Sequence, residues 1–502
     1  MVQDGGNAFD AAVATAATLN VVEPVNTGLG GDVFACFRTA DGDVGAMRSC
    51  GYAPDSATLE RIRERAAEHQ NVAPEDAQMP FRGPLTVTVP GTARGWELTI
   101  DEFGTKPLGE VLQPAIQYAM EGFPVSEIIA ADWREASDQF VDKSGHEQFF
   151  PDGRPPDVGE TVRLENLGHS LERIASEGAD VVYEGEIAEA IAGEVQSHGG
   201  LLTVEDLAAF EPELLDPMST TYRGTEVFEL PPNNQGLIAL EALNIAEELD
   251  AGAAPLHSAE RVHHFAEAFK LAFHDGHHYI TDPEFEEIPP LASKAYAAER
   301  AKQVGDTANS GIEVGNPRSE HADTVLLTVA DEEGNVVTFI NSRYKQFGSG
   351  LVAGETGIAL QNRGGSFSLD PTDPNHIEPR KRPFHTLVPA LARLDDEQWI
   401  GFGVMGGYMQ PQGHLQVLAN LVDYEQPLQA ALDEPRWRYK ADGRLALEER
   451  IAGSLGSKLS RRGHDVQVLP PGAFGGGQLA QYDDGTLSAA TDPRKDGNAV
   501  GF

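Results

Sequence analysis

A threonine opens the most strongly patterned stretch of the chain, and a serine closes it. Thr324 begins an apolar, β-branched run that reaches Ala330, and Ser342 ends a second run that begins at Val336. A hydroxyl attacks an amide carbonyl poorly unless a nearby base takes its proton. Acyl transfer by Thr324 would therefore need an activating group beside it.

The elements that position these hydroxyls are two short strands. Turn-forming residues separate the two apolar runs at 331–335, which predicts a β-hairpin with Thr324 at its leading edge. By itself this pattern is typical of a core strand pair without catalytic function.

Further motifs follow the hairpin with fixed order and spacing. They are Phe347-Gly-Ser-Gly350, Lys381-Arg-Pro383, Gly406-Gly407 and Asp492-Pro-Arg494, and Gly5-Gly-Asn-Ala8 precedes them all. Together with Asp323-Thr324 and its strand, this set resembles the γ-glutamyltranspeptidase family of N-terminal-nucleophile hydrolases, over most of the chain.

The resemblance implies that a precursor cuts itself between Asp323 and Thr324. Residues 1–323 would form the large subunit and residues 324–502 the small subunit, interwoven as one domain. It also implies an α+β fold, a four-layer αββα sandwich with two antiparallel sheets between helical layers. The freed α-amine of Thr324, with an ordinary pKa of about 7.7 to 8.0, would act as the base.

Other catalytic roles follow from the same resemblance. Ser342 matches the hydroxyl residue that contacts the nucleophile and would position or polarise the Thr324 oxygen. Gly406 and Gly407 match the backbone donors that bind the oxyanion, where the lack of side chains lets two N–H groups approach.

Several positions depart from the glutamyl-binding pattern of the family. Cys50 stands where an arginine would grip the substrate α-carboxylate, and Arg48 is a candidate substitute because strand alternation places it on the same face. The other matched positions hold Tyr344 for an asparagine, Ser366 for an aspartate, and His385-Thr386 for a pair of serines. Most of the expected ionic clamp for a glutamyl group is therefore missing.

Three hypotheses of function remain. The first is an autoprocessed enzyme acting on γ-glutamyl amides such as glutathione, and the second is an amidohydrolase with another acyl group. In the second, Arg363 would bind an acyl-chain carboxylate, as in relatives that resemble cephalosporin acylases or oxamate amidohydrolases. The third is an uncleaved, non-catalytic homologue.

The histidines and cysteines predict neither a metal site nor a disulfide framework. Five histidines cluster on one predicted helix, but a metal site would need two or three of them to converge, and buried or surface histidines are the expected outcome: His263, His264, His274, His277, His278. Cys36 and Cys50 are the only cysteines, and we expect them to be unpaired. No cofactor is expected.

Composition limits the partners. The sequence has 37 Lys plus Arg against 79 Asp plus Glu, a formal charge of −42, which disfavours nucleic acid and anionic membranes. Acidic residues spread along the whole chain indicate a salt-adapted surface rather than one acidic patch. No targeting segment or long apolar window is evident, so we expect a cytoplasmic protein. Its expected partners are a small amide substrate and its own second fragment, with further pairing of these heterodimers left open.

Local signals predict several supporting elements. Asn7 caps a helix at 8–21, and Thr203 with Asp206 forms a capping box. Glycines at 28–31 indicate close backbone packing rather than a phosphate loop. The alternating segment 85–89 predicts a strand, and residues 305–322 predict a linker before the nucleophile.

Overall fold

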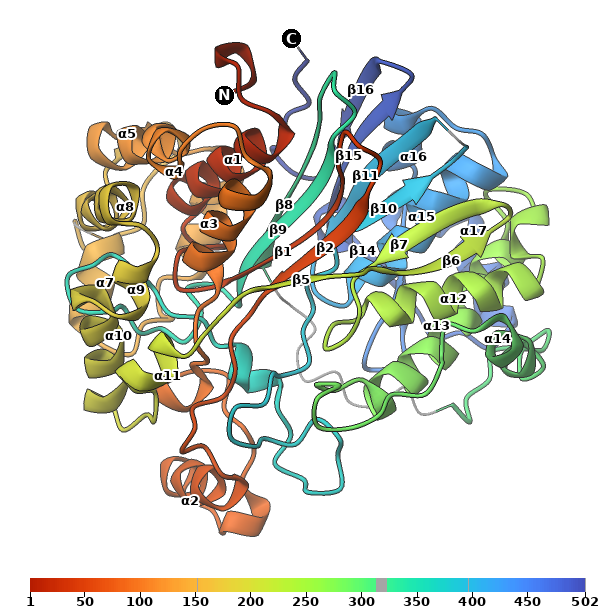
Figure 1. Cartoon of the computed structure of the whole chain (residues 1–502). Coiled ribbons are helices and arrows are strands. Elements are labelled where there is room, and N and C mark those ends of the chain that lie inside the picture. Colours follow the sequence, from red (N-terminus) through yellow and green to blue (C-terminus); the bar gives the residue numbers. More distant parts are fainter. Residues whose placement is uncertain (151, 313–322, 396, 502) are drawn as a thin grey trace.

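The computed structural model describes residues 1–150, 152–312, 323–395 and 397–501. Helices and mainly antiparallel strands share this part of the chain, so the predicted α+β class is confirmed. Figure 1 shows two sheets in the middle of the molecule, with helices on the outer side of each.

Five antiparallel strands form the sheet that carries the predicted nucleophile. Their order is β5-β2-β1-β9-β8, with bounds β1 Asp32–Arg38, β2 Val44–Ser49, β5 Glu213–Leu215, β8 Asp323–Ala330 and β9 Val336–Tyr344. The predicted hairpin is confirmed as β8 and β9, which pair from Ala330↔Val336 to Asp323↔Tyr344. β8 is an edge strand of this sheet.

Six antiparallel strands form the second sheet, in the order β16-β15-β11-β10-β7-β6. Their bounds are β6 Met218–Tyr222, β7 Thr225–Glu229, β10 Ala390–Arg393, β11 Gln398–Met405, β15 Gly476–Asp483 and β16 Thr486–Thr491. Two minor sheets pair β3 Phe123–Pro124 with β4 Thr161–Val162, and β12 Trp437–Tyr439 with β13 Leu445–Glu448 and β14 Val466–Leu469. Both main sheets contain strands from either side of the Asp323–Thr324 bond.

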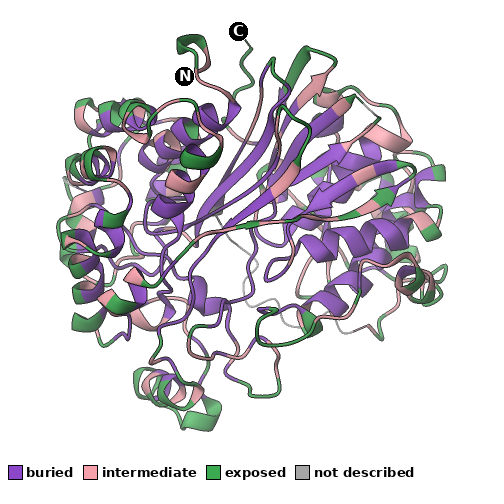
Figure 2. Ribbon diagram, viewed as in Figure 1, coloured by how far each residue is buried: buried purple, intermediate pink, exposed green. Residues whose placement is uncertain are grey.

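The central strands are buried on both faces. In β1, Val33 and Ala35 pack toward the N-terminal helices, whereas Phe34 and Cys36 join a cluster that includes Leu391 of the second sheet. Side chains alternate between the two faces of a strand, so β1 contributes to both clusters. The central strands are accordingly buried, and exposed residues lie on the outer helices, the loops and the edge strands β5, β6 and β16 (Figure 2).

The helices divide between the two outer sides. Those next to the five-stranded sheet and in the adjoining N-terminal region are α1 Ala8–Val22, α2 Leu59–Gln70, α3 Thr92–Phe103, α4 Leu108–Val111, α5 Gln113–Glu121, α6 Glu127–Glu135, α7 Lys143–Phe149, α8 Glu165–Glu177, α9 Asp180–Tyr183, α10 Glu186–Ser197 and α11 Val204–Ala208. The others are α12 Gly236–Glu248, α13 Ala259–Tyr279, α14 Lys294–Ala301, α15 Met409–Asp423, α16 Leu428–Asp433 and α17 Glu449–Arg461. The cap at Asn7 and the capping box at Thr203 are both confirmed.

The predicted strand at 85–89 is wrong. A 3-10 turn covers Pro84–Thr86, and the rest of the segment is extended without a strand partner. Its amides bond singly to loops, with Val89 N donating to the Tyr52 carbonyl at 3.2 Å. Pro84 and Pro90 lack the N–H groups that a ladder needs, so alternation here reflects burial among loops.

The linker prediction lies partly outside the described residues. Residues 305–312 are described and irregular, whereas 313–322 are not among the described ranges. Cys36 and Cys50 are both buried and free, as expected. Among the described helices, none has the length and apolar character needed to cross a membrane.

Candidate functional site

Thr324 lies at an irregularity in the β8–β9 ladder. Asp323 pairs with Tyr344 and Val325 with Asn341, so the register shifts across Thr324. The Thr324 side chain is completely buried. Tyr344 on the opposite strand has a φ of +81°, an unusual value for a residue other than glycine. Such irregularities concentrate at functional sites because they re-aim a side chain.

Ser342 contacts the candidate nucleophile. The Thr324 hydroxyl donates to Ser342 Oγ at 3.3 Å, and Ser342 Oγ also accepts from the Tyr344 amide at 2.8 Å. The main chain of Ser342 pairs with Asp32 of β1. A Cβ on Gly31 would lie 2.4 Å from the Ser342 carbonyl oxygen, so the predicted close backbone packing is confirmed at this glycine.

Gly406 and Gly407 follow the end of β11 at the level of Thr324. A Cβ on Gly403 would meet Leu326 at 2.9 Å, and one on Gly401 would meet Thr338, which pairs with Thr328. The two strands therefore run in opposite directions, with Gly401 near the level of Thr328 and Gly403 near Leu326. Two residues further along β11, the chain reaches the level of Thr324. The φ angles are +123° at Gly406 and +60° at Gly407. Within the described part of the chain, neither amide N–H makes a hydrogen bond, so both are available to an oxyanion.

Gln235, which sequence reasoning missed, ties this glycine turn to the neighbouring loop. Its side-chain amide donates to the Gly407 carbonyl at 2.8 Å and to the Thr386 carbonyl at 2.9 Å. The Asn-Asn-Gln-Gly sequence just before α12 could have indicated this role, because a buried side-chain amide needs hydrogen-bond partners.

Cys50 and Arg48 lie on the same side of the sheet but differ in character. Burial raises the pKa of the Cys50 thiol to about 12, so it presents no charge to a carboxylate. Arg48 is buried and paired with Glu213, at 2.8 Å between Nη2 and Oε2, and it donates to the Pro232 carbonyl at 2.6 Å. The guanidinium of Arg48 is therefore engaged, and its role as a substitute clamp stays a prediction.

Ser366 and Tyr344 surround Arg363. The Ser366 hydroxyl has the Arg363 and Phe384 carbonyl oxygens as its neighbours, each at 2.7 Å, so it adds no charge at the position where the resemblance implies an aspartate. The Tyr344 ring lies under the guanidinium, 4.3 Å from Arg363 Cζ to the ring centroid. This cation–π contact holds the plane of the guanidinium in place.

Arg363 is fully buried and only partly paired. Its Nη1 donates to the Thr386 hydroxyl at 2.9 Å, whereas Nε and Nη2 have no hydrogen-bond partner among the described residues. Burial lowers the pKa of Arg363, and the negative charge of Asp32 opposes that shift.

Asp32 connects the loops that carry the predicted substrate-binding residues. Its carboxylate accepts from Gly91 N at 3.2 Å and Gln361 Nε2 at 3.0 Å, and it lies 3.0 Å from His385 Nε2. The Leu387 amide donates to His385 Nδ1 at 3.2 Å, which assigns the ring proton to Nε2. His385 is therefore neutral and donates to Asp32.

The pKa shifts of this pair follow from burial. Desolvation raises the pKa of Asp32 to about 7, and the charge of Arg363 partly offsets it. Desolvation, with the charges of Arg363 and Arg48, lowers the pKa of His385 well below its usual range. Sequence reasoning missed Asp32, although an acidic residue directly before a wholly apolar strand is an uncommon pattern.

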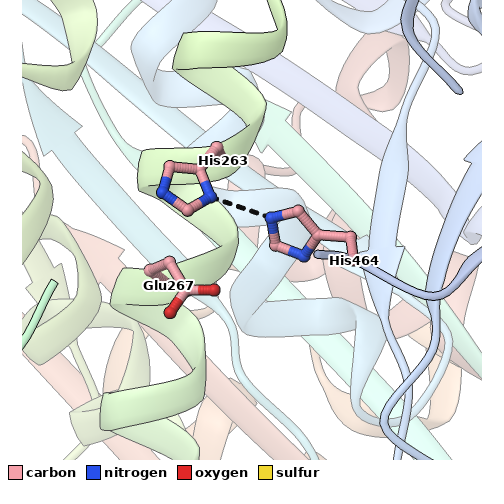
Figure 3. Close-up of side chains that lie close together, drawn as sticks. All are labelled: His263, Glu267 and His464. Carbon is pink, nitrogen blue, oxygen red and sulfur yellow. Dashed lines mark hydrogen bonds between the residues drawn. The ribbon is translucent and has the colours of Figure 1, made fainter. Parts of the chain in front are cut away.

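A second polar cluster contains potential metal ligands. His263 and Glu267, one turn apart on α13, meet His464, with the two rings 2.9 Å apart between Nδ1 and Nε2 (Figure 3). Glu267 Oε1 lies 2.6 Å from Lys270 Nζ, and Glu267 Oε2 accepts from Asn309 N at 3.0 Å. Lys270 thus competes with any metal for the carboxylate, and the metal-free expectation stays a prediction. Another such group, partly exposed, is Asp142, Glu194 and His198.

Known proteins match this chain over its whole length. The profile of the family described as Gamma-glutamyltranspeptidase matches residues 1–502. The chain is 37% identical to the glutathione hydrolase-like YwrD proenzyme of Bacillus subtilis, covering 100% of this chain and 95% of that protein. It is 34% identical to the oxamate amidohydrolase proenzyme of Klebsiella pneumoniae, covering 100% and 95%. The crystal structure of cephalosporin acylase from Bacillus halodurans is similar with a TM-score of 0.91 and 41% identity, covering 99% of this chain and 92% of that one.

Proposed function

Because the chain belongs to the γ-glutamyltranspeptidase family, we propose that it is a proenzyme that cuts itself between Asp323 and Thr324. Residues 1–323 and 324–502 then form the two subunits of one interwoven domain, the four-layer αββα sandwich of N-terminal-nucleophile hydrolases. The packing of helices outside two antiparallel sheets supports this assignment. The relatives named as proenzymes support the processing step.

The observation that carries the proposal is the position of Thr324. Its hydroxyl bonds to Ser342 at the register shift in β8, with the free amides of Gly406 and Gly407 at the same level. After cleavage the α-amine accepts the hydroxyl proton, and the Thr324 oxygen attacks the amide carbonyl. The tetrahedral oxyanion bonds to the two glycine amides, the amine leaves with a proton, and an acyl-enzyme forms. Water or a second amine then takes the acyl group and releases Thr324.

For the substrate, we infer a γ-glutamyl amide such as glutathione, in which the acyl group is γ-glutamyl, as the family and the glutathione hydrolase-like relative suggest. A second candidate is an acyl group without an α-ammonium. Cys50 and Ser366 favour it, because neither offers a charge to a zwitterionic head group. A buried ionic group without a partner is costly, so the glutamyl group would need other contacts.

Two measurements test the proposal. A denaturing gel with N-terminal sequencing should give two fragments, the smaller beginning at Thr324. Hydrolysis of a γ-glutamyl anilide and a glutaryl anilide should then separate the two acyl groups, and activity on glutaryl alone would remove the glutamyl assignment. Active enzyme that remains one polypeptide would exclude Thr324 as an N-terminal nucleophile. The uncleaved, non-catalytic alternative predicts neither fragments nor turnover.

The acidic surface supports a further part of the proposal, adaptation to high salt. With a formal charge of −42, self-repulsion weakens the fold at low ionic strength and is screened when salt is added. Activity and the unfolding temperature should both rise between tens of millimolar and molar salt. Full activity at tens of millimolar would exclude the adaptation.

A further inference from the structure

Arg363 presents an unused edge inside the candidate site. Nε and Nη2 are adjacent donors on one side of the guanidinium plane, and both lack a partner among the described residues although the side chain is fully buried. A buried donor without a partner is unfavourable, so such a group calls for a ligand. The Nε/Nη2 edge matches a carboxylate, which accepts two parallel hydrogen bonds from it.

Asp32 leaves that edge open. It is buried close enough to Arg363 for each to shift the pKa of the other, yet no direct ion pair joins them in the described part of the chain. The carboxylate oxygens of Asp32 instead face donors on Gly51, Gly91, Gln361 and His385. Asp32 therefore balances the charge of Arg363 without occupying its hydrogen-bonding edge.

We propose that the Nε/Nη2 edge of Arg363 binds a terminal carboxylate of the acyl group, and that Asp32 takes up one proton from solvent when this carboxylate binds. The inference rests on the proposed function and names the chemistry of its acyl group. Two carboxylates beside one guanidinium in a buried site repel each other, and protonation of one removes the excess charge. The hydrogen-bonding neighbours of Asp32 are donors, so the new O–H finds its acceptor on the incoming carboxylate.

Apart from the Thr324 amine of the cleaved enzyme, the surrounding groups leave Asp32 as the one that titrates. Its charged or titratable neighbours are Arg363 on the 363–366 turn, His385, Cys50 at the end of β2, and Tyr183 of α9. His385 is held neutral, and burial raises the pKa values of the Cys50 thiol and the Tyr183 hydroxyl. Near Arg363, Tyr344 and Tyr408 contribute the remaining acidic hydroxyls. Arg48, which also acts on His385, is paired with Glu213.

The test is equilibrium binding of glutarate to the processed enzyme, with pentanoate as the matched ligand that lacks the second carboxylate. We expect pentanoate to bind at least ~10-fold more weakly. Glutarate affinity should be nearly constant between about pH 6 and 7, where glutarate is ionised and Asp32 already holds its proton, and fall by up to ~10-fold per pH unit above it, because the complex holds a proton that the free site releases. Calorimetry at about pH 8, in two buffers of different ionisation enthalpy, should show uptake of up to one proton for glutarate and less for pentanoate.

Variants separate this role from a structural one. Asp32→Asn should bind glutarate as tightly as wild type or more tightly, without the pH dependence above 7, whereas Arg363→Gln should bind glutarate no better than pentanoate. A slope that survives in Asp32→Asn belongs to the Thr324 amine and overturns the proposal, as does glutarate binding without proton uptake in wild type. Should Asp32→Asn fail to fold, the wild-type proton count and Arg363→Gln still decide. Cleaved, active enzyme with pH-independent glutarate binding refutes this inference alone, and an uncleaved chain refutes the proposed function.

Discussion

Two buried polar networks in this protein differ in how completely they are paired. Around α13, Glu267 contacts Lys270 and the Asn309 amide, and His263 contacts His464 and the Gly305 carbonyl at 2.7 Å. Arg363, by contrast, keeps two donors without partners among the described residues. The α13 network joins three segments of chain and pairs its buried carboxylate with a buried cation, whereas the guanidinium of Arg363 has no ion pair among the described residues. The unpaired edge of Arg363 is therefore the feature that suits a ligand.

The largest effect should come from the nucleophile. Thr324→Ala should abolish both the cleavage and the turnover while the unfolding temperature stays within a few degrees, because only a methyl and a hydroxyl are lost. Gel analysis, anilide hydrolysis and thermal unfolding measure the three quantities. Thr324→Ser is the matched control and should retain slow cleavage. Turnover in the alanine variant would move the nucleophile elsewhere.

Breaking the complete network should destabilise the fold. Lys270→Met leaves the Glu267 carboxylate buried without its cation, which we expect to lower the free energy of unfolding by about 3 to 5 kcal/mol. Urea denaturation measures the loss. Lys302→Met removes an exposed lysine that pairs with Glu299 and should change stability by less than about 1 kcal/mol. Equal effects of the two variants would mean that the α13 network contributes no more than a surface pair.

The two networks should respond to pH with opposite sign. Burial lowers the pKa of His464 to about 3, so its neutral folded form loses stability as pH falls from 6.5, by up to ~1.4 kcal/mol per pH unit. Asp32, with its pKa raised to about 7, loses stability as pH rises from 3.8 toward 7. Unfolding of His464→Gln between pH 4 and 7 should therefore show stability that falls more steeply with pH than in wild type, and Asp32→Asn the reverse. Parallel profiles would contradict these assignments.

A small loss of stability is expected at Arg363. Arg363→Met removes one hydrogen bond, to Thr386, and two donors that have no partner among the described residues, and Asp32 can bind a proton once its countercharge is gone. At pH 6 we expect a loss of only about 1 kcal/mol, well below that of Lys270→Met, measured by the same urea titration. A loss as large as that of Lys270→Met would show that Arg363 is a structural residue.

Sequence reasoning predicted what short-range patterns determine. The hairpin, the caps at Asn7 and Thr203, and the close packing at Gly31 all follow from neighbouring residues. The strand predicted at 85–89 was wrong because alternation reports burial, and only a partner strand makes a ladder.

The pairing of the site was beyond the sequence. Asp32 meets His385 across more than 350 positions of chain, and Arg48 pairs with Glu213 of β5. No local sequence pattern shows that the Arg48 guanidinium is paired, whereas two donors of Arg363 have no partner among the described residues. That distinction appears only once the two sheets are assembled.

The interleaving of strands in both main sheets has a consequence for the cut protein. The proposed scission at Thr324 would open an edge strand and remove a single pairing there, whereas β1 would still lie against β9 and β7 against β10. The two fragments would thus already be in contact at the moment of cleavage, and no association step would be needed. They should unfold together in one transition, and fragments expressed from separate genes should associate poorly.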